Sequence, residues 1–190
     1  MNMLNMPEKT EREKMLSNEL YLATDEELIR MQFTASQLLH RFNFSPPDPI
    51  QHQQIISQLF GKIGTNLAIR PPFYCDYGCH IFAGDNLLIN FDCTILDCNE
   101  VYLGNNVLLA PKVQIYTAYH PTDPNLRLSG KELAAPVTIG DNVWLGGGVI
   151  VCPGVSIGSN TTIGAGSVVT KNIPSNVVAV GNPCRVIKSV

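Results

Sequence analysis

The sequence predicts a mainly β protein: a parallel β-helix of hexapeptide repeats with an N-terminal α-helical segment and one long loop excursion. Three observations favour this fold. Aliphatic residues recur at steps of six in two runs, from Leu103 to Ile115 and from Ile139 to Val169. Glycine often follows them, and Asn or Asp often comes next, as in "LGNNV" and "IGDNV". A polar, irregular stretch, residues 116–138, separates the two runs. Such a fixed short period indicates a solenoid.

Residues 1–62 are expected to form a helical segment that packs on the core. Thr24 and Glu27 fit a capping box in front of a helix. Apolar residues then recur every three or four positions, at Leu28, Met31, Ala35, Leu38 and Phe42. Asp48 is a suitable N-cap for a second helix, with Pro49 at its first position. We expect these helical faces to be packing surfaces.

Residues 63–190 are expected to form the β-helix. A six-residue period suits a short strand and a tight turn, because Gly and Asn tolerate the left-handed backbone conformation of such turns. A second small or apolar residue lies four residues after each anchor, and both positions can point into a narrow interior; these are Val143, Val149, Val155, Thr161 and Ser167. Three hexads close a triangular coil of about 18 residues, and coils stack about 4.8 Å apart. The hexads before Leu103 are less regular, and periodicity does not indicate the hand of the coil.

Composition limits the partners of the chain. Charged residues make up 15% of the 190 residues, where about 25% is typical, which favours burial of surface against further copies. A net charge of −3 favours neither nucleic acid nor an anionic membrane. No apolar run reaches the roughly 18 residues of a membrane span. Residues 1–16 contain no apolar core of a secretion signal, so we expect a cytoplasmic protein.

Six cysteines raise the question of disulfides or zinc. Their spacings are not paired CxxC motifs, and we expect free thiols that act as small apolar residues. Cys75 falls on a first interior position of the repeat, and Cys79 and Cys93 on second ones. We therefore expect these three to lie in the core.

His120 stands where the loop 116–138 leaves the repeats, directly before Pro121. Because a β-helix interior is filled, a site must lie on faces, edges and loops. Imidazole can take the proton of a hydroxyl that attacks a thioester and return it to the leaving thiolate. The alternative is an ordinary solvated loop histidine. His40 and His52 lie on helical stretches and are expected to be structural.

Motifs throughout the chain resemble one family. The segments that carry the likeness are "EREKMLSNELY", "CDYG", "INFDC", "YHPTDP", "VTIGDNVWLGGG" and "GNPCRVIK". The chain resembles the hexapeptide-repeat acyltransferases and, within them, the maltose/galactoside O-acetyltransferases. The resemblance implies a left-handed helix, a homotrimer with active sites between subunits, and direct transfer from acetyl-CoA to a sugar hydroxyl. It implies no metal.

The same resemblance implies residue roles on the acceptor side. His120 is the general base, and Asn90 orients or stabilises the reacting centre and contacts CoA. Asp76 in "CDYG" corresponds to a contact to acceptor hydroxyls. Cys98 occupies another acceptor position but cannot replace a carboxylate, so Asp97 is a possible substitute. Asp25 is a candidate for an N-terminal acidic contact, although the local alignment is ambiguous.

On the donor side the resemblance implies CoA contacts by Gly147, Ala165, Thr170, Lys171 and Arg185. Gly147 allows a close backbone approach, and Arg185 suits a CoA phosphate. The alternatives are a turn glycine and surface charges. We expect Trp144 to support the site by packing.

Two other functions compete with the O-acetyltransferase. One is a metal-dependent hydratase like the γ-type carbonic anhydrases, but only His80 and His120 lie in the repeat region, and zinc catalysis commonly uses three protein ligands. The other is a structural β-helix, which predicts neither a distinctive loop histidine nor a basic C-terminal strip. The sequence therefore favours an acetyltransferase acting on maltose, glucose, a galactoside or another hydroxylated molecule.

Overall fold

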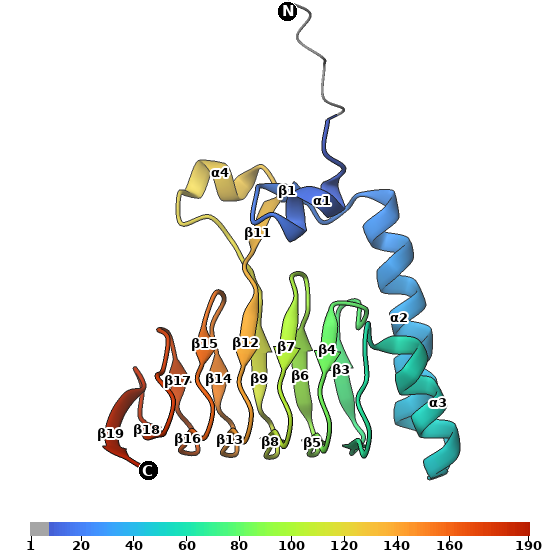
Figure 1. Ribbon diagram of the computed structural model, residues 1–190. Helices are drawn as coiled ribbons and strands as arrows, with labels where there is room; N and C mark the ends of the chain where they lie inside the picture. Colours follow the sequence, from blue (N-terminus) through green and yellow to red (C-terminus); the bar gives the residue numbers. More distant parts are fainter. Residues whose placement is uncertain (1–7) are drawn as a thin grey trace, which may run out of the picture.

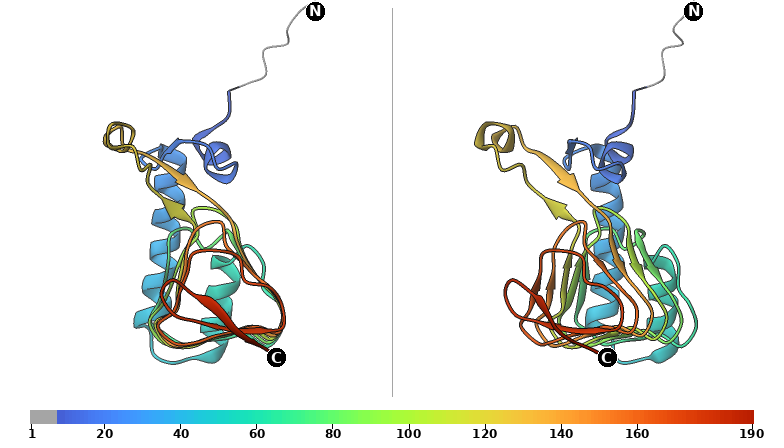
Figure 2. Two further views of the ribbon diagram at one scale, coloured as in Figure 1. Left: turned by 90° about the vertical axis from the view of Figure 1, so that its left-hand side faces the viewer. Right: turned by 60° about the vertical axis from the view of Figure 1, so that its left-hand side comes forward.

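The computed structural model describes residues 8–190, which form a prism of three parallel sheets (Figure 1). Viewed along its axis the prism is triangular, and a hairpin and the N-terminal segment project from one apex (Figure 2). Residues 1–7, which belong to the segment inspected for a secretion signal, lie outside the described residues. The predicted parallel β-helix is confirmed, and its left hand stays a prediction.

Each side of the prism is one sheet. The seven-stranded face contains β2 (Ala68–Ile69), β5 (Leu88–Ile89), β8 (Leu108–Leu109), β13 (Trp144–Leu145), β16 (Thr162–Ile163), β18 (Val177–Val180) and β19 (Arg185–Ser189). The five-stranded face contains β3 (Phe73–Cys75), β6 (Cys93–Leu96), β9 (Gln114–Tyr116), β14 (Ile150–Val151) and β17 (Val168–Val169). The four-stranded face contains β4 (Ile81–Ala83), β7 (Val101–Leu103), β12 (Val137–Ile139) and β15 (Ser156–Ile157). Within these three faces, all strand pairs are parallel except β18 with β19.

Three edges join these faces in chain order. The first edge, between the seven- and five-stranded faces, consists of residues 70–72, 90–92, 110–113, 146–149 and 164–167. The second edge, between the five- and four-stranded faces, consists of residues 76–80, 97–100, 117–136, 152–155 and 170–172. The third edge, which returns to the seven-stranded face, consists of residues 84–87, 104–107, 140–143, 158–161 and 174–176.

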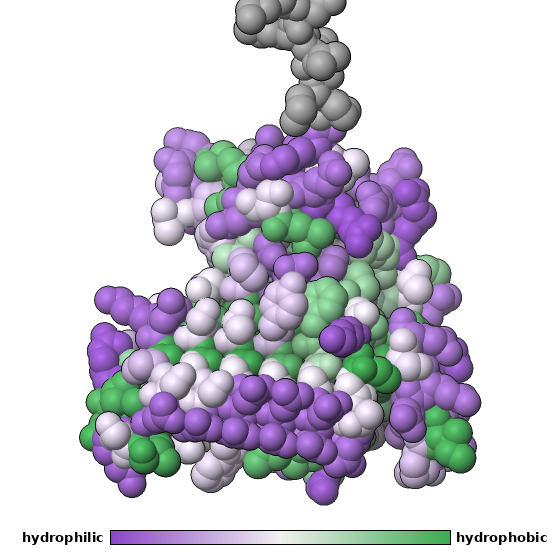
Figure 3. Space-filling view, viewed as in Figure 1, coloured by the Kyte–Doolittle hydropathy of each residue, from purple (hydrophilic) through white to green (hydrophobic). Residues whose placement is uncertain are grey.

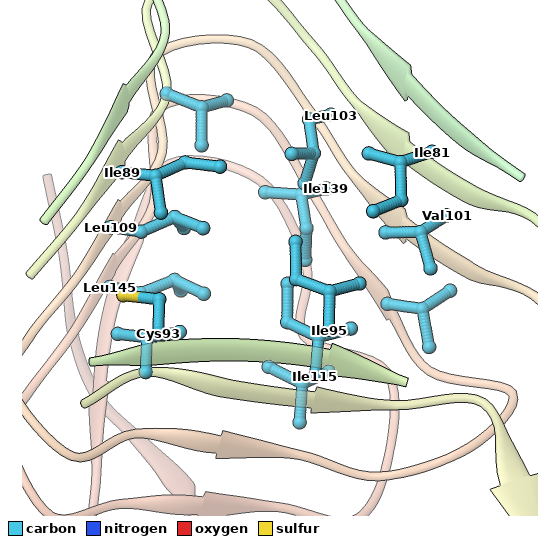
Figure 4. Close-up of a cluster of buried hydrophobic side chains, with 14 of the residues drawn as sticks. Ile81, Ile89, Cys93, Ile95, Val101, Leu103, Leu109, Ile115, Ile139 and Leu145 are labelled. Atoms are coloured by element: carbon cyan, nitrogen blue, oxygen red, sulfur yellow. The ribbon is translucent and has the colours of Figure 1, made fainter. Parts of the chain in front are cut away.

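Strand register explains why the early repeats are less regular. Ile89 pairs with Leu109, 20 residues later, whereas Leu145 pairs with Ile163, 18 residues later. The two extra residues lie at the second edge, where 76–80 and 97–100 make wider turns. Inward side chains form columns along the axis, as Ile89, Leu109 and Leu145 do in Figure 4. The second interior positions from Val143 to Ser167 are all buried, as predicted.

The excursion 116–138 was expected to be irregular, but it contains regular secondary structure. It contains β10 (Ala118–Tyr119), α4 (Pro124–Leu128) and β11 (Lys131–Ala134), and β10 and β11 form an antiparallel hairpin. β11 also pairs with β1 (Tyr21–Leu22) from the N-terminal segment. The three strands form a small sheet above the second edge (Figure 1). The hairpin is ordered because a distant segment supplies its third strand.

The N-terminal segment contains α1 (Glu11–Leu16), α2 (Glu26–Phe44) and α3 (Pro49–Leu59). α2 and α3 cover the end of the first coil (Figure 1). Asp48 caps α3 with Pro49 following it, as predicted. The capping box at Thr24 was wrong: Asp25 is the N-cap, and its carboxylate accepts hydrogen bonds from the two backbone N–H groups of Glu27 and Leu28.

Expected apolar positions of α2 are partly confirmed. Leu28, Ala35 and Phe42 are buried, whereas Met31 and Leu38 are only half-buried. No helix in residues 8–190 has the length and apolar character needed to cross a membrane.

All six cysteines lie in the described residues and are free thiols, as expected. Cys93 is buried in the main core, and Cys75 packs against it. The placement of Cys79 was wrong: it packs against a second apolar cluster beneath the hairpin, made of Met15, Tyr21, Leu28, Tyr77, Cys98 and Ala134. The two-residue extension of this corner takes Cys79 out of the repeat phase.

An asparagine ladder runs along the third edge. Asn66, Asn86, Asn106, Asn142, Asn160 and Asn176 all have positive φ, and each of the first five donates a side-chain hydrogen bond of 2.9 Å to the next. Asparagine tolerates this left-handed conformation better than most residues. Figure 3 shows the hydrophilic band that these turns form along the lower edge of the four-stranded face. The ladder holds successive coils in register at an exposed edge.

Candidate active site

His120 follows β10, the outer strand of the small sheet, and its side chain is exposed. In the hairpin, Ala118 pairs with Ala134 and Tyr119 with Leu133. Extended by one residue, this register places His120 opposite Glu132. Tyr119 donates a hydrogen bond of 2.8 Å from its hydroxyl to the Asn18 side-chain oxygen. The strand before His120 is thus anchored on both sides, while the imidazole stays open to a ligand.

Asp76 lies at the second edge, directly after β3, and is half-buried. Its carboxylate oxygen Oδ2 accepts a hydrogen bond of 3.3 Å from the Cys98 thiol. Burial raises the pKa of the Asp76 carboxyl, and the Cys98 hydrogen bond opposes that rise. Cys98 therefore stands beside the candidate acceptor carboxylate as a hydrogen-bond donor rather than as a second acid.

Asp97 has a different place from the expected acceptor contact. Its side chain is 0% exposed, and its carboxylate accepts hydrogen bonds from the backbone N–H groups of Asp76, Tyr77 and His80, at 3.0, 2.8 and 3.2 Å. Burial raises the pKa of Asp97 to about 7 against the opposing effect of these bonds. Asp97 holds the turn that presents Asp76, and it does not reach the surface.

Asp25 also has a structural task, as the N-cap of α2. Its side chain is half-buried, and its Oδ1 accepts hydrogen bonds from two backbone N–H groups. The structure gives no contact between Asp25 and Asp76 or His120. Asp25 as an acceptor contact stays a prediction.

Three of the candidate residues share the first edge. Asn90 follows β5, and the backbone N–H of Gly166 bonds the Gly147 carbonyl, so that Gly147 and Ala165 lie on neighbouring coils. The Asn90 side-chain oxygen accepts a hydrogen bond of 2.9 Å from the Phe91 N–H. This bond directs the amide NH2 of Asn90 away from its own backbone, where it can donate to a ligand.

The glycines of "LGGG" have three different reasons to be glycine. A Cβ on Gly146 would lie 2.6 Å from the Ala165 nitrogen, and Gly148 has a φ of +66°. A Cβ on Gly147 would meet only the Pro111 carbonyl oxygen, at 3.5 Å, which is an ordinary contact. The packing of this chain therefore does not require glycine at 147, and its contact with CoA stays a prediction.

The three remaining donor-side candidates, Thr170, Lys171 and Arg185, lie on exposed surface at the C-terminal end of the prism. Thr170 and Lys171 follow β17 at the second edge, and Arg185 begins β19. The side chains of all three are exposed, and the Arg185 guanidinium bonds the Cys184 carbonyl at 2.8 Å. Trp144 is 51% exposed on the seven-stranded face, so it is not a core residue of this chain, and its support of the site by packing stays a prediction.

The candidate residues thus form two groups on one chain. Asn90, Gly147 and Ala165 lie on the first edge, and His120, Asp76, Thr170 and Lys171 lie on the second. The five-stranded face separates the two edges (Figure 2). One chain presents both halves of a site but does not bring them together.

Sequence reasoning missed a polar cluster beneath the hairpin. Glu132 accepts a hydrogen bond of 3.1 Å from the Tyr21 hydroxyl, and its charge contributes to the raised pKa of Asp76. Asn99 and Thr117, both buried, bond at the base of the hairpin. An asparagine two residues after an aspartate carries no local sign of burial, so only the three-dimensional structure identifies it.

Metal chemistry finds no support in the described part of the chain. Residues 8–190 contain no group of three or more His, Cys, Asp or Glu side chains arranged to hold an ion. His80, one of two repeat-region histidines, is buried and shares a hydrogen bond of 2.8 Å between Nδ1 and the Asp97 carbonyl oxygen.

Comparison with known proteins gives a consistent family. Residues 14–64 match the maltose acetyltransferase hexapeptide capping motif, and residues 136–171 match the bacterial transferase hexapeptide of six repeats. The galactoside O-acetyltransferase of Lactococcus lactis is 43% identical over 187 residues, which cover 97% of this chain and 90% of that protein.

Solved structures agree over nearly the whole chain. A maltose O-acetyltransferase from Clostridium difficile has a TM-score of 0.95 at 52% identity, covering 96% of this chain and 98% of that one. A galactoside acetyltransferase in complex with coenzyme A has a TM-score of 0.92 at 40% identity, covering 96% and 92%. A hexapeptide-repeat acetyltransferase from Vibrio cholerae, in complex with acetyl-CoA, has a TM-score of 0.89 at 33% identity, covering 95% and 98%.

Proposed function

This chain belongs to the maltose/galactoside O-acetyltransferase family of hexapeptide-repeat enzymes and is an acetyl-CoA-dependent O-acetyltransferase; from this premise, we propose that it acetylates a hydroxyl of a sugar or glycoside, with His120 as the general base. Galactoside and maltose acetyltransferases are the relatives that support the sugar acceptor. Which sugar is used is a question for a substrate panel.

The observation that carries the role of His120 is its open imidazole. Of the four histidines, all of which are described, His80 is buried, His52 lies 3.4 Å from the Ser45 hydroxyl, and the His40 ring packs tilted against Phe44 with ring centroids 5.1 Å apart. His120 is exposed, and the described residues offer it no hydrogen bond or aromatic partner. A general base must reach the substrate proton, and His120 is free to do so.

The reaction follows from this position. His120 accepts the proton of the sugar hydroxyl as the hydroxyl oxygen attacks the thioester carbon of acetyl-CoA. The carbonyl oxygen becomes negative, and the amide NH2 of Asn90 is available to donate to it. The C–S bond then breaks, and the imidazolium returns its proton to the CoA thiolate. An acetate ester and free CoA are the products.

The remaining residues bind and orient the two substrates. Asp76 has one carboxylate oxygen on Cys98 and the other available for acceptor hydroxyls. Gly147 and Ala165 line the first edge, where the backbone can approach the pantetheine arm of CoA. Thr170, Lys171 and Arg185 supply polar and cationic groups for the CoA phosphates.

A homotrimer would bring the two edges together. β6 spans four residues between them, and a strand rises about 3.3 Å per residue, so the edges lie roughly 13 Å apart. Reacting groups must lie about 3 Å from the base and from the oxyanion donor. We therefore propose that each active site lies between two chains, with the first edge of one facing the second edge of its neighbour.

Thiol release from acetyl-CoA, measured with a panel of maltose, glucose, galactosides and non-sugar alcohols, tests the acceptor. We expect release above the acceptor-free rate with at least one sugar. Activity only with non-sugar alcohols would reject the sugar acceptor. His120→Ala should lower kcat by about 10²–10⁴-fold, and His40→Ala, which changes an exposed histidine elsewhere, should leave kcat unchanged. Near-normal turnover of His120→Ala would reject the base.

A further inference from the structure

Asn99 lies at the second edge, in the turn between β6 and β7, and is 1% exposed. Its side-chain amide is fully engaged. The Glu100 N–H donates 2.7 Å to Asn99 Oδ1, which fixes the oxygen side of the amide. The NH2 side therefore faces three backbone carbonyl oxygens, of Met15 at 3.0 Å, Leu16 at 3.3 Å and Ala134 at 2.8 Å. One side chain thus ties α1, β11 and the prism together.

Thr117 completes this connection on the outgoing strand of the hairpin. The backbone N–H of Asn99 donates 2.8 Å to the Thr117 hydroxyl oxygen, and that hydroxyl donates 2.7 Å to the Leu96 carbonyl. Thr117 lies directly before β10, and Ala134 ends β11. Asn99 therefore holds both ends of the hairpin. At one of these ends Thr117 lies three residues before His120.

The residues directly before Asn99 hold Asp76, the candidate acceptor contact at the same edge. Asp97 accepts the backbone N–H of Asp76 at 3.0 Å, and the Cys98 thiol bonds the Asp76 carboxylate at 3.3 Å. A segment of three residues, 97–99, consequently fixes the acceptor carboxylate through its first two members and the histidine hairpin through its third. No bond of this segment reaches the first edge.

We propose that Asn99 is a positioning residue for the acetyl transfer, which sets the hairpin of His120 relative to the prism and to the N-terminal segment. The inference rests on the proposed role of His120. A base displaced by about 1 Å can lose about 10²-fold in rate. Acetyl-CoA binding should be indifferent to Asn99, because Asn99 bonds none of the proposed CoA contacts on the first edge or at Thr170, Lys171 and Arg185. The expected signature is a fall in kcat with an unchanged KM for acetyl-CoA.

Asn99→Ala and the matched control Asn43→Ala separate positioning from stability. Asn43 is also a side-chain clamp, bonding the Phe73 N–H and carbonyl at 2.9 Å each, but it joins α2 to β3 away from the hairpin. We expect both variants to melt at lower temperature. Assayed below both transitions, only Asn99→Ala should lower kcat, by about 10- to 100-fold. Normal kcat in Asn99→Ala, or an equal loss in Asn43→Ala, would overturn the proposal.

Thr117→Val covers the case in which Asn99→Ala does not fold. Valine keeps the shape and removes the hydroxyl that accepts the Asn99 N–H and donates to the Leu96 carbonyl. We expect the same signature at smaller size, about 3- to 10-fold in kcat, with the KM for acetyl-CoA unchanged. A folded Thr117→Val variant with wild-type kcat would overturn the positioning role of Asn99, as wild-type kcat in Asn99→Ala would.

A double-mutant cycle with His120→Ala distinguishes this proposal from the proposed function. If Asn99 acts through His120, the double variant should turn over no more slowly than His120→Ala alone. Multiplying effects would show that Asn99 acts by another route and would overturn the inference. Near-normal kcat in His120→Ala alone would instead reject the base assignment, whatever Asn99→Ala does.

Discussion

Two inactive variants should restore activity when they are mixed, if the active site lies between chains. His120→Ala removes the proposed base at the second edge, and Asn90→Ala removes the proposed oxyanion donor at the first edge. The loss of a base costs about 10²–10⁴-fold, and the loss of such a donor about 10²–10³-fold. Each variant alone should therefore retain no more than about 1% of wild-type activity.

The expected recovery follows from random assembly. In an equal mixture, half of the second edges carry an intact His120, and half of the first edges carry an intact Asn90. Because the two edges of a site come from different chains of a ring, about one quarter of the sites should be intact. The two edges of one chain lie roughly 13 Å apart across the five-stranded face, so His120 and Asn90 of the same chain cannot act on one substrate pair.

The assay is thiol release from acetyl-CoA with the best acceptor of the panel, after joint unfolding and refolding. Differently tagged variants, purified through both tags, ensure that mixed assemblies are measured. Each mixed trimer has one neighbouring pair of three that joins an intact first edge to an intact second edge, so recovery of about a third of the wild-type rate supports the shared site. Baseline activity in mixed assemblies of confirmed mass would refute the geometric reasoning.

Three further changes probe separate parts of the molecule. Gly147→Ala should leave the unfolding free energy within about 0.5 kcal/mol of the wild-type value and raise the KM for acetyl-CoA. Gly148→Ala, at a φ of +66°, should cost about 1 kcal/mol of stability. Equal KM values in Gly147→Ala and wild type would contradict the ligand-contact role of Gly147. The pKa of Asp97 is raised to about 7, so the folded state binds this proton more tightly than the unfolded state, and the stabilisation is full below about pH 4 and is lost as the pH rises through about 7. The unfolding free energy, measured with denaturant, should fall more steeply over that range for wild type than for Asp97→Asn. Parallel curves for the two proteins would contradict the buried acid. Asn106→Ala should cost about 2 kcal/mol through two lost ladder bonds and a strained φ, and Asn106→Gly about 1 kcal/mol less; equal melting of the two variants would show that backbone strain contributes nothing.

The periodic part of the fold could be predicted from sequence because each hexad repeats one local solution. An anchor such as Leu145 and a second position such as Val143 point inward for the same reason in every coil. The less regular early hexads were visible in the sequence, but their cause was not, because two added residues at a corner, as near His80, change the spacing without changing the sheet.

The hairpin and its anchors depend on partners far away in the chain. β10 has two residues, too few for a periodic signal, and β11 finds a strand partner in Tyr21, 111 residues before Glu132. The Asn99 amide bonds Met15, 84 residues away, and Ala134, 35 residues away. Thr24 and Asp25 both suit an N-cap by composition, and only the backbone geometry of the helix start distinguishes them. Candidate residues that the repeats carry, such as Gly147, were accessible to sequence reasoning, whereas the residues that support the hairpin were not.

The coil register passes over the excursion without disturbance. Leu109 pairs with Leu145, 36 residues later, just as other coils pair at 18 or 20, and the Ala135 N–H closes the gap on the Thr117 carbonyl at 2.9 Å. The coils on either side therefore keep their register with residues 118–134 inserted between them. Residues between His120 and β11, such as α4, can vary in length and sequence while the coils, the first edge and the base keep their places.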